Sequence, residues 1–199
     1  MDTRKQKQTQ RRNILVTSFS FFIISFVGWL YETVLMYLIY GEYFDRGFLT
    51  LPFCPIYGGV IAMLYFFLGT PNSGNFATWV EHFSAKRGWH SGIARMLRYV
   101  GYYLISMGLA TGVELIIGLI FESAGCSLWS YCGMACNYNG IICLPISLFW
   151  GFLITIVMRY PFTWMVKGLE KIPMWILLIL TIVFSIAMSV DFIFCLTKL

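Results

Sequence analysis

The sequence predicts an all-α membrane protein: a polytopic bundle of about five transmembrane helices with two repeated helix pairs and a fifth helix outside the repeat. The first observation is composition, because 59% of the 199 residues are hydrophobic and only 12% are charged. Soluble domains carry about a quarter charged residues. The second observation is that apolar runs of about 20 residues recur along the chain, each long enough to cross a bilayer. Five crossings use roughly half the chain, which leaves short loops and a single membrane domain.

The order of polar and apolar segments divides residues 1–199 into five parts. Gly and Pro are frequent in residues 47–58, which predicts a broken or re-entrant start to the second span. Residues 70–98 mix aromatic and basic side chains and are typical of an amphipathic segment at a membrane surface. The predicted parts are a cytosolic basic tail (1–13), a first helix pair (14–69), a cytosolic amphipathic loop (70–98), a second helix pair (99–158) and a fifth span (173–196).

Basic residues indicate the orientation of these parts. With the N-terminus inside, the inner segments hold twelve Lys and Arg residues, and the outer segments hold only Arg46 and Lys198. Lys and Arg favour cytosolic loops, so the pattern predicts a multi-pass protein with a cytosolic N-terminus and an extracytoplasmic C-terminus. The basic residues lie beside apolar runs rather than in a patch with stacking aromatics, which favours membrane lipids as partners and argues against nucleic acid.

An internal repeat links the two predicted helix pairs. Residues 46–58 align without gaps to residues 139–151, and both read polar-Gly-apolar-apolar-x-Leu-Pro, followed after four residues by aromatic-Gly. Each segment follows a span that contains one glutamate, Glu32 in the first pair and Glu114 in the second. Both pairs start inside, so the repeats are expected to be parallel and related by an axis along the membrane normal.

Three carboxylates interrupt the apolar runs, namely Glu32, Glu114 and Asp191. A charged group in hydrocarbon costs about 2.5–3.5 kcal/mol on insertion scales, so each requires a partner, water or a function. At a rise of about 1.5 Å per residue they lie about 22–27 Å from the inner ends of their spans, in the outer half of the membrane. The polar residues expected at the same level are Arg46, Asn137 and Asn139.

Two interpretations of these residues remain open. In the first they line an outward-facing polar vestibule that binds a small cationic or zwitterionic solute or relays protons. In the second Arg46 pairs with Glu32 or Glu114, the other groups reach the headgroup layer, and the contacts only fix helix packing. The candidate substrate-binding residues are Glu32, Arg46, Glu114, Asn137, Asn139 and Asp191.

Other kinds of site are less well supported by the sequence. Cys126, Cys132 and Cys136 lie in an outer loop, where they form either one disulfide with a spare thiol or free packing thiols. Both histidines fall in the cytosolic loop, so no Cys/His metal set is expected on either face. The chain lacks GxxxxGK[ST], HExxH and GxSxG, so we assign no catalytic residue and no cofactor.

Several motifs resemble a known family over about residues 25–160. They are Gly28-Trp29-x-Tyr31-Glu32-Thr33, Arg46-Gly47-Phe48-Leu49, Pro52-x-Cys54-Pro55-Ile56-Tyr57-Gly58 and Asn137-x-Asn139-Gly140 with Cys143-Leu144. The chain is similar to the CmpB-like family described as putative ABC-transporter type IV permeases. That resemblance implies a permease in the bacterial cell membrane with a separate ATPase subunit. Ser130, Ile141 and Leu51 depart from the family pattern, which bears on the geometry of the outer loop.

The interpretation favoured by the sequence is a transport component, an ABC-permease-like subunit that forms a homo-oligomer. Residues 70–98 then dock an ATPase or rest on anionic lipid. A second class is a non-catalytic assembly or sensor protein, in which the charged cluster holds helices together. A third is a membrane-embedded enzyme with Glu32 and Glu114 as acid and base, for which the sequence supplies no nucleophile.

Overall fold

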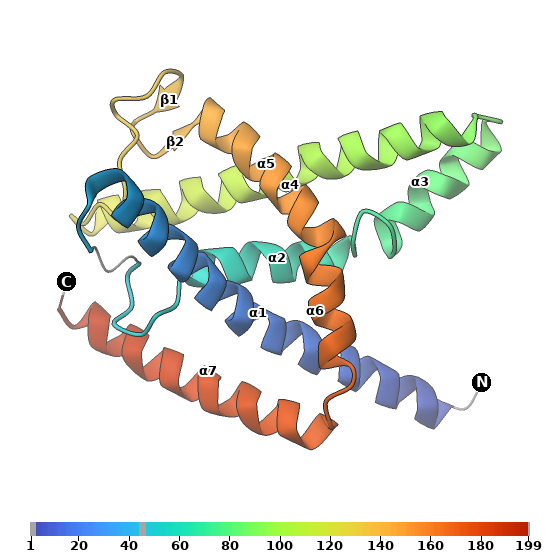
Figure 1. Cartoon of the computed structure of the whole chain (residues 1–199), viewed down its shortest axis with the longest axis horizontal. Helices are drawn as coiled ribbons and strands as arrows, with labels where there is room; N and C mark the ends of the chain where they lie inside the picture. Colours follow the sequence, from blue (N-terminus) through green and yellow to red (C-terminus); the bar gives the residue numbers. More distant parts are fainter. Residues whose placement is uncertain (1–2, 44–46, 199) are drawn as a thin grey trace. The chain divides into compact units, whose positions relative to one another are not determined.

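The computed structural model describes residues 3–43 and 47–198 and consists mainly of helices (Figure 1). Within these residues the only regular structure besides helix is one short antiparallel β-hairpin, so the all-α prediction is confirmed. The elements are α1 (Thr3–Tyr40), α2 (Pro55–Phe67), α3 (Asn75–Lys86), α4 (Ser91–Ser123), β1 (Asn137–Tyr138), β2 (Ile142–Cys143), α5 (Leu144–Arg159), α6 (Pro161–Leu169) and α7 (Met174–Leu196).

Three of the described helices, α1, α4 and α7, are long and apolar enough to cross a bilayer. Helices α5 and α6 meet at a bend of 41° and make a fourth crossing if they are one broken span. Helix α2 has 13 residues. That is about 20 Å of helix, shorter than the hydrocarbon core of about 30 Å. The prediction of five spans therefore stays a prediction, and its second span is the shortest.

The chain divides into two compact units, which we describe separately. Unit 1 comprises Met1–Ala62 and Met165–Leu199, and unit 2 comprises Met63–Trp164. In unit 1, α1 and α7 lie side by side and run in the same direction (Figure 1). Near their starts an Arg12 guanidinium N–H donates to the carbonyl of Ile172 at 3.2 Å. Farther along, the rings of Phe22 and Phe184 stack with centroids 5.7 Å apart.

The core of unit 1 is formed by the segment that leads into α2. Leu49 and Phe53 lie in this non-helical segment and pack with Phe22 of α1 and Met188 of α7. The backbone N–H of Cys54 donates to the carbonyl of Ser25 at 2.9 Å, which ties the segment to α1. The predicted broken start of the second span is therefore an ordered, protein-packed segment, the condition under which irregular backbone is tolerated at membrane depth.

Unit 2 is built around α4. Helix α5 packs against α4 in the opposite direction, and the Tyr103 hydroxyl donates to the carbonyl of Leu148 at 3.3 Å. Helix α3 packs against the first part of α4, where the rings of Phe76 and Tyr102 lie 6.1 Å apart. Tyr102 is fully buried, and its hydroxyl donates to the carbonyl of Gly69 at 2.9 Å. This bond satisfies the polar end of the largest buried side chain in the unit.

Two glycines permit the close helix crossings, one in each unit. A Cβ on Gly58 of α2 would overlap the Phe21 carbonyl oxygen and the Ser25 hydroxyl of α1. A Cβ on Gly151 of α5 would lie 2.8 Å from Met107 Cβ and 3.2 Å from the Tyr103 carbonyl oxygen of α4. Small residues at such points let helix backbones approach closely, as is common in membrane helices.

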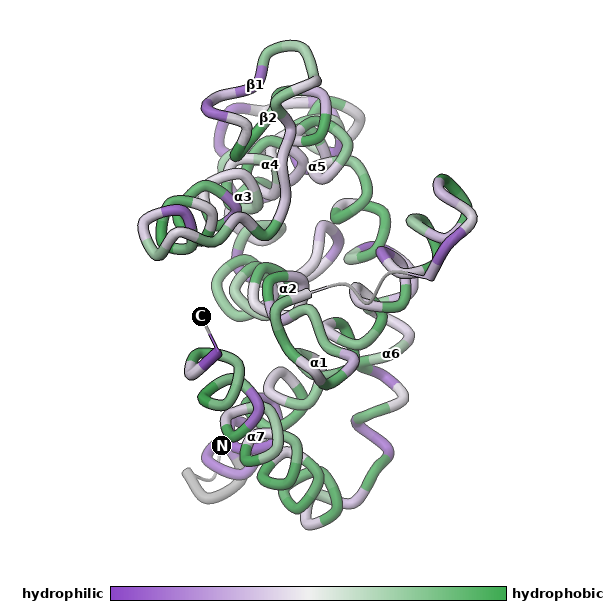
Figure 2. Tube along the Cα trace, turned by 90° about the vertical axis from the view of Figure 1, so that its left-hand side faces the viewer, coloured by the Kyte–Doolittle hydropathy of each residue, from purple (hydrophilic) through white to green (hydrophobic). Residues whose placement is uncertain are grey.

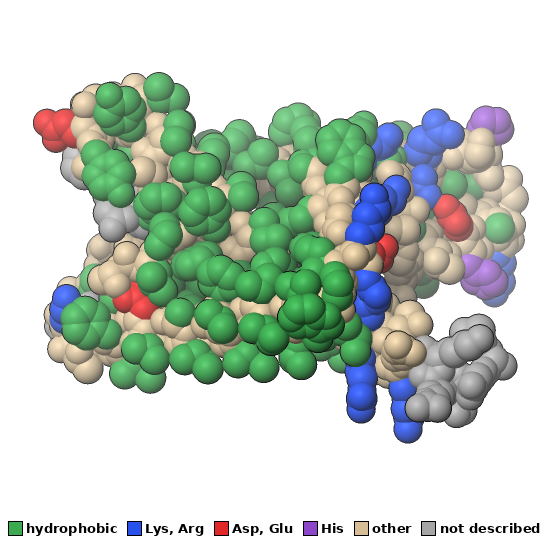
Figure 3. Space-filling view, turned by 60° about the horizontal axis from the view of Figure 1, so that its bottom comes forward, with side chains coloured by type: hydrophobic (Ala, Val, Ile, Leu, Met, Phe, Trp, Pro, Cys, Tyr) green, Lys and Arg blue, Asp and Glu red, His purple; other side chains and the backbone are tan. Residues whose placement is uncertain are grey.

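The surfaces of the long helices are apolar. Only 17% of the most apolar window of α7 is buried, although its hydropathy is the highest of the three spans. Hydrophobic residues run along the helices in Figure 2, and hydrophobic side chains cover much of the face seen in Figure 3. Contiguous exposed apolar surface of this extent requires lipid or a protein partner.

Candidate functional site

Glu32, in the last part of α1, is bound by a tyrosine of α2. The Tyr57 hydroxyl donates to a carboxylate oxygen of Glu32. The tyrosine ring lies over Gly28, one turn earlier on α1, where a Cβ would overlap the ring. Glycine at position 28 therefore makes the space in which Tyr57 reaches the glutamate.

Glu114, in unit 2, is bound in a similar way by a tyrosine from the loop after α4. Glu114 is only 7% exposed, and the Tyr131 hydroxyl donates to its Oε1 at 2.7 Å. The backbone N–H of Tyr131 donates to the carbonyl of Gly140 at 2.7 Å, so the hairpin region holds the tyrosine in place. Ile141 packs over Gly118, one turn beyond Glu114, where a Cβ would overlap it.

The loop around Glu114 is ordered by a β-hairpin that the sequence analysis did not predict. Asn137 pairs with Cys143, and Tyr138 pairs with Ile142. Asn139 and Gly140 have φ of 51° and 71°, the left-handed values that suit an Asn-Gly turn. The Asn137 side chain accepts from the Gly140 N–H at 3.0 Å and donates to the Met134 carbonyl at 2.7 Å. Both ends of this amide are therefore used within the loop, whereas Asn139 lies exposed in the turn.

Asp191 of α7 is 8% exposed and binds the segment before α2. Its carboxylate accepts hydrogen bonds from the Thr50 hydroxyl and, at 2.9 Å, from the Leu51 N–H. The Cys195 thiol lies one turn later at 4.0 Å from Oδ1. These contacts fix an irregular stretch of backbone to a transmembrane helix.

The structure thus gives each predicted carboxylate a hydroxyl partner from another segment. The partners Tyr57, Tyr131 and Thr50 were missed by sequence reasoning, although Tyr57 is the aromatic residue of the repeated aromatic-Gly pair. Arg46 lies outside the described residues, so its predicted pairing with a glutamate stays a prediction. Every carboxylate–hydroxyl contact described here lies within a single unit.

The described residues contain two notable cavities. A groove of about 520 Å³ in unit 1 is lined mainly by Phe21, Phe22, Pro55, Met188, Phe192 and Ile193. A pocket of about 10 Å³ in unit 2, near Glu122 and Trp129, has room for about one water. Neither cavity is lined by Glu32 or Glu114.

Thiols and metal ligands are dispersed in the described part of the chain. The six cysteines are free, with Cys132 and Cys136 exposed in the loop before the hairpin. The described residues bring together no group of three or more His, Cys, Asp or Glu side chains that could hold a metal ion. The chemistry available at Glu32 and Glu114 is that of a carboxylate beside a phenol, which can attract a cation or exchange a proton.

The comparisons with known proteins identify a family. A family model described as "putative ABC-transporter type IV" matches residues 19–196. The matched range begins within α1, ends with the last residue of α7 and includes Glu32, Glu114 and Asp191. No curated protein and no solved structure matches the chain.

Proposed function

The chain belongs to the family described as putative ABC-transporter type IV, and from this premise we propose that it is the permease-like membrane subunit of a transporter. The protein is a membrane protein, as its apolar helices and its family indicate. We place it in a bacterial cell membrane, where an outward-facing polar vestibule binds a small solute.

One observation carries this proposal: both units place a glutamate of a transmembrane helix against a tyrosine hydroxyl. Glu32 accepts from Tyr57, and Glu114 accepts from Tyr131. Carboxylates are rare within transmembrane helices, and those that occur there commonly line a pathway for a solute or an ion. The phenol keeps the carboxylate hydrogen-bonded while leaving it able to change partner when a cation or proton arrives.

The remaining predicted residues take different roles in this proposal. Asp191 and Asn137 are hydrogen-bonded to backbone, and each holds a loop of its own unit in place. Asn139, exposed in its turn, is a further candidate contact for the solute; Arg46 is proposed for this role from the sequence alone, because it lies outside the described residues. Glu32 and Glu114 make the contacts with the solute.

The register of the helix crossings supports two parallel repeats. Phe21 and Tyr103, which meet Gly58 and Gly151, each lie eleven residues before the glutamate of their helix. Gly58 and Gly151 are themselves equivalent in the repeated sequence motif. The motif and the packing contacts are independent observations, because the motif does not include α1 or α4. We therefore propose that spans 1–2 and 3–4 are duplicated pairs and that α7 is the fifth span.

The distribution of basic residues within each unit supports a cytosolic N-terminus. In unit 1, Arg12 of α1 lies beside Ile172, just before α7, together with the nearby Arg11 and Lys171, whereas Lys198 is the basic residue among those described that follows the other end of α7. In unit 2, Arg98 and Arg159 lie where α4 begins and α5 ends, opposite the hairpin. Lys and Arg favour the cytosolic side, so we place the glutamates toward the extracytoplasmic face.

A transporter of this class needs a partner, because the chain has no GxxxxGK[ST] motif. We propose that a separate ATPase subunit docks on the cytosolic side and that the membrane subunit forms a homo-oligomer. Tagged protein purified from native membranes should therefore carry a nucleotide-binding subunit with ATPase activity.

Matched variants test the site. Glu32→Gln and Glu114→Gln should abolish stimulation of that ATPase by transported solutes while the complex remains assembled. Glu42→Gln, which removes an exposed carboxylate just after α1, is the control and should behave as wild type. If the chain purifies alone and all three variants behave as wild type, the transport proposal fails.

One observation favours the alternative class, an assembly or sensor protein. Asp191 is hydrogen-bonded to the Thr50 hydroxyl and the Leu51 N–H, and Asn137 to two backbone groups of its own loop, as residues with a purely structural role would be. For that class the glutamate variants should alter the oligomeric state of the protein and leave no transport phenotype.

A further inference from the structure

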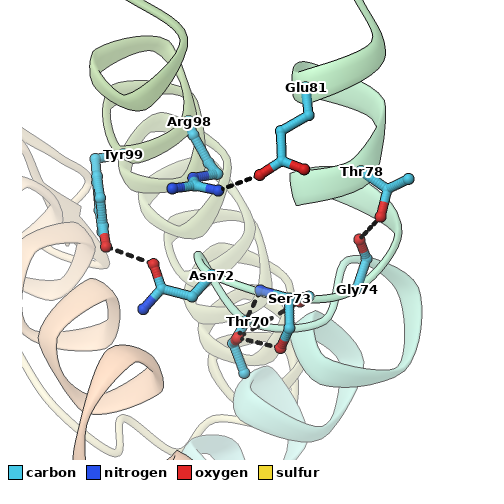
Figure 4. Close-up of polar contacts among 8 residues, drawn as sticks. All are labelled: Thr70, Asn72, Ser73, Gly74, Thr78, Glu81, Arg98 and Tyr99. Atoms are coloured by element: carbon cyan, nitrogen blue, oxygen red, sulfur yellow. Dashed lines mark hydrogen bonds and ion pairs between the residues drawn. The ribbon is translucent and has the colours of Figure 1, made fainter. Parts of the chain in front are cut away.

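Polar groups of the turn before α3, of α3 and of the first part of α4 lie near one another at the end of unit 2 opposite the hairpin (Figure 4). The Tyr99 hydroxyl donates to Asn72 Oδ1 at 2.6 Å. Asn72 lies in the turn between α2 and α3, which is closed by a contact of 2.9 Å between the hydroxyls of Thr70 and Ser73. The adjacent Arg98 donates to Glu81 of α3 at 2.6 Å. Side chains of three segments are therefore held in one place.

A second arginine reaches the same tyrosine from α5. The Arg159 guanidinium lies 4.7 Å from the ring centroid of Tyr99 and 4.9 Å from that of Tyr160. The Arg98 guanidinium lies 5.9 Å from the same Tyr99 ring. Aromatic faces attract such cations, and both guanidinium groups have the ring of Tyr99 as a neighbour.

The two arginines have only one carboxylate between them among the described residues. Arg98 pairs with Glu81, whose side chain is 63% exposed, and Arg159 forms no ion pair with any described residue. The Nε atoms of both arginines are buried and donate to no acceptor in the described part of the chain. Two guanidinium groups with a single carboxylate partner favour the binding of a further anion that has several acceptor oxygens.

The position of the cluster fits the headgroup layer of a membrane. The apolar part of α4 begins after Arg98, and α5 ends at Arg159. Tyr99 and Tyr160 flank this level, as aromatic residues do at membrane interfaces. Described basic residues at this end outnumber the acidic Glu81: Lys86, Arg87, Arg95, Arg98 and Arg159.

We propose that Arg159, Arg98 and the Asn72 amide bind the phosphate group of an anionic phospholipid, with Tyr99 as the floor of the site. The planar guanidinium of Arg159 donates two parallel hydrogen bonds to phosphate oxygens. Asn72 contributes its amide N–H₂, because its oxygen is already bonded to Tyr99. This site is independent of the transport proposal and lies in the opposite part of unit 2 from Glu114.

Native mass spectrometry of the full chain in detergent, titrated with phosphatidylglycerol, tests the site. Arg159→Gln should weaken phosphatidylglycerol binding by about tenfold or more. Arg95→Gln removes the same charge from an exposed arginine of α4 that forms no ion pair or cation–π contact with a described residue, and it should change binding by about twofold or less. Equal weakening by both variants would mean that binding is diffuse electrostatic attraction, and the proposed site would be wrong.

Two further measurements address misfolding of the Arg159→Gln variant and binding of a soluble phosphate in place of a lipid. Asn72→Ala alters only an exposed turn residue and should also weaken phosphatidylglycerol binding, so it decides the question if Arg159→Gln does not fold. Inorganic phosphate should not displace bound phosphatidylglycerol. Displacement at comparable concentrations would assign the site to a soluble phosphate and overturn the lipid proposal.

Discussion

Thr50 and Asp191 are joined by a hydrogen bond although 141 residues separate them in the sequence. The same carboxylate accepts from the Leu51 N–H at 2.9 Å. Because Leu49 and Phe53 on either side pack into the core of unit 1, the carboxylate holds the irregular segment at the point where it turns toward α2. Asp191 is therefore the main polar tether between α7 and the start of α2.

Removal of this tether should destabilise unit 1. Asp191→Ala leaves the Leu51 N–H without its acceptor, and we expect a loss of about 1–3 kcal/mol of unfolding free energy. Thr50→Val removes only the hydroxyl and should cost about 1 kcal/mol. Thermal unfolding in detergent measures both, and Ser189→Ala on the same helix is the control. If the loss of unfolding free energy in the Asp191→Ala, Thr50→Val double variant equals the sum of the two single losses, the two side chains do not interact.

Local sequence patterns predicted the elements better than their contacts. Gly and Pro in residues 47–58 indicated the irregular segment, and apolar length indicated α1, α4 and α7. The polar tail 1–13 was expected to be separate from the first span, but α1 already begins at Thr3. Lys, Arg and Gln are good helix formers, so the helix continues beyond the apolar run.

The contacts of the candidate site could not be predicted because they join distant segments. Thr50 carries no local signal that it meets Asp191, and Tyr131 reaches Glu114 only because the hairpin turns the loop back. That hairpin did have a signal, since Asn139-Gly140 is a typical hairpin turn. The repeat predicted that Glu32 and Glu114 occupy related positions, but not that tyrosines from different places would bind them.

The two tyrosines should contribute unequally to stability. Glu114 is buried, whereas Glu32 is half-buried, so water can replace the lost hydroxyl more easily at Glu32. Tyr131→Phe should therefore cost about 1.5–3 kcal/mol, and Tyr57→Phe clearly less. Tyr138→Phe, at an exposed position in β1, should have no effect on the unfolding midpoint. Equal losses at positions 57 and 131 would contradict the importance of burial.

The helix crossings at Gly58 and Gly151 should tolerate no added methyl group. Gly58→Ala pushes a Cβ into the Phe21 carbonyl oxygen of α1, and Gly151→Ala pushes one against Met107 Cβ of α4, so each should cost about 1–3 kcal/mol. Gly59→Ala and Gly108→Ala are matched controls, because a Cβ there meets no atom within 4 Å. These controls should be neutral or stabilising, since alanine favours helix. If the Gly58→Ala and Gly151→Ala variants unfold at the same midpoint as the two control variants, the helices do not cross closely at these glycines.

The exposed thiols allow the proposed orientation to be measured directly. Cys132 and Cys136 are free and exposed, so a membrane-impermeant maleimide added to intact cells should label them without a reductant. Labelling should disappear in the Cys126→Ser, Cys132→Ser, Cys136→Ser triple variant, because Cys126 is the remaining partly exposed thiol and Cys54, Cys143 and Cys195 are buried.

The opposite face is tested by adding Ser91→Cys to that triple variant, since Ser91 is exposed at the start of α4. This thiol should react only after the cells are permeabilised, because the basic residues around it favour the cytosolic side. Labelling of wild type that requires a reductant would mean that the loop cysteines form a disulfide. Labelling of Ser91→Cys in intact cells, with none at Cys132 and Cys136, would mean that unit 2 crosses the membrane in the reverse direction.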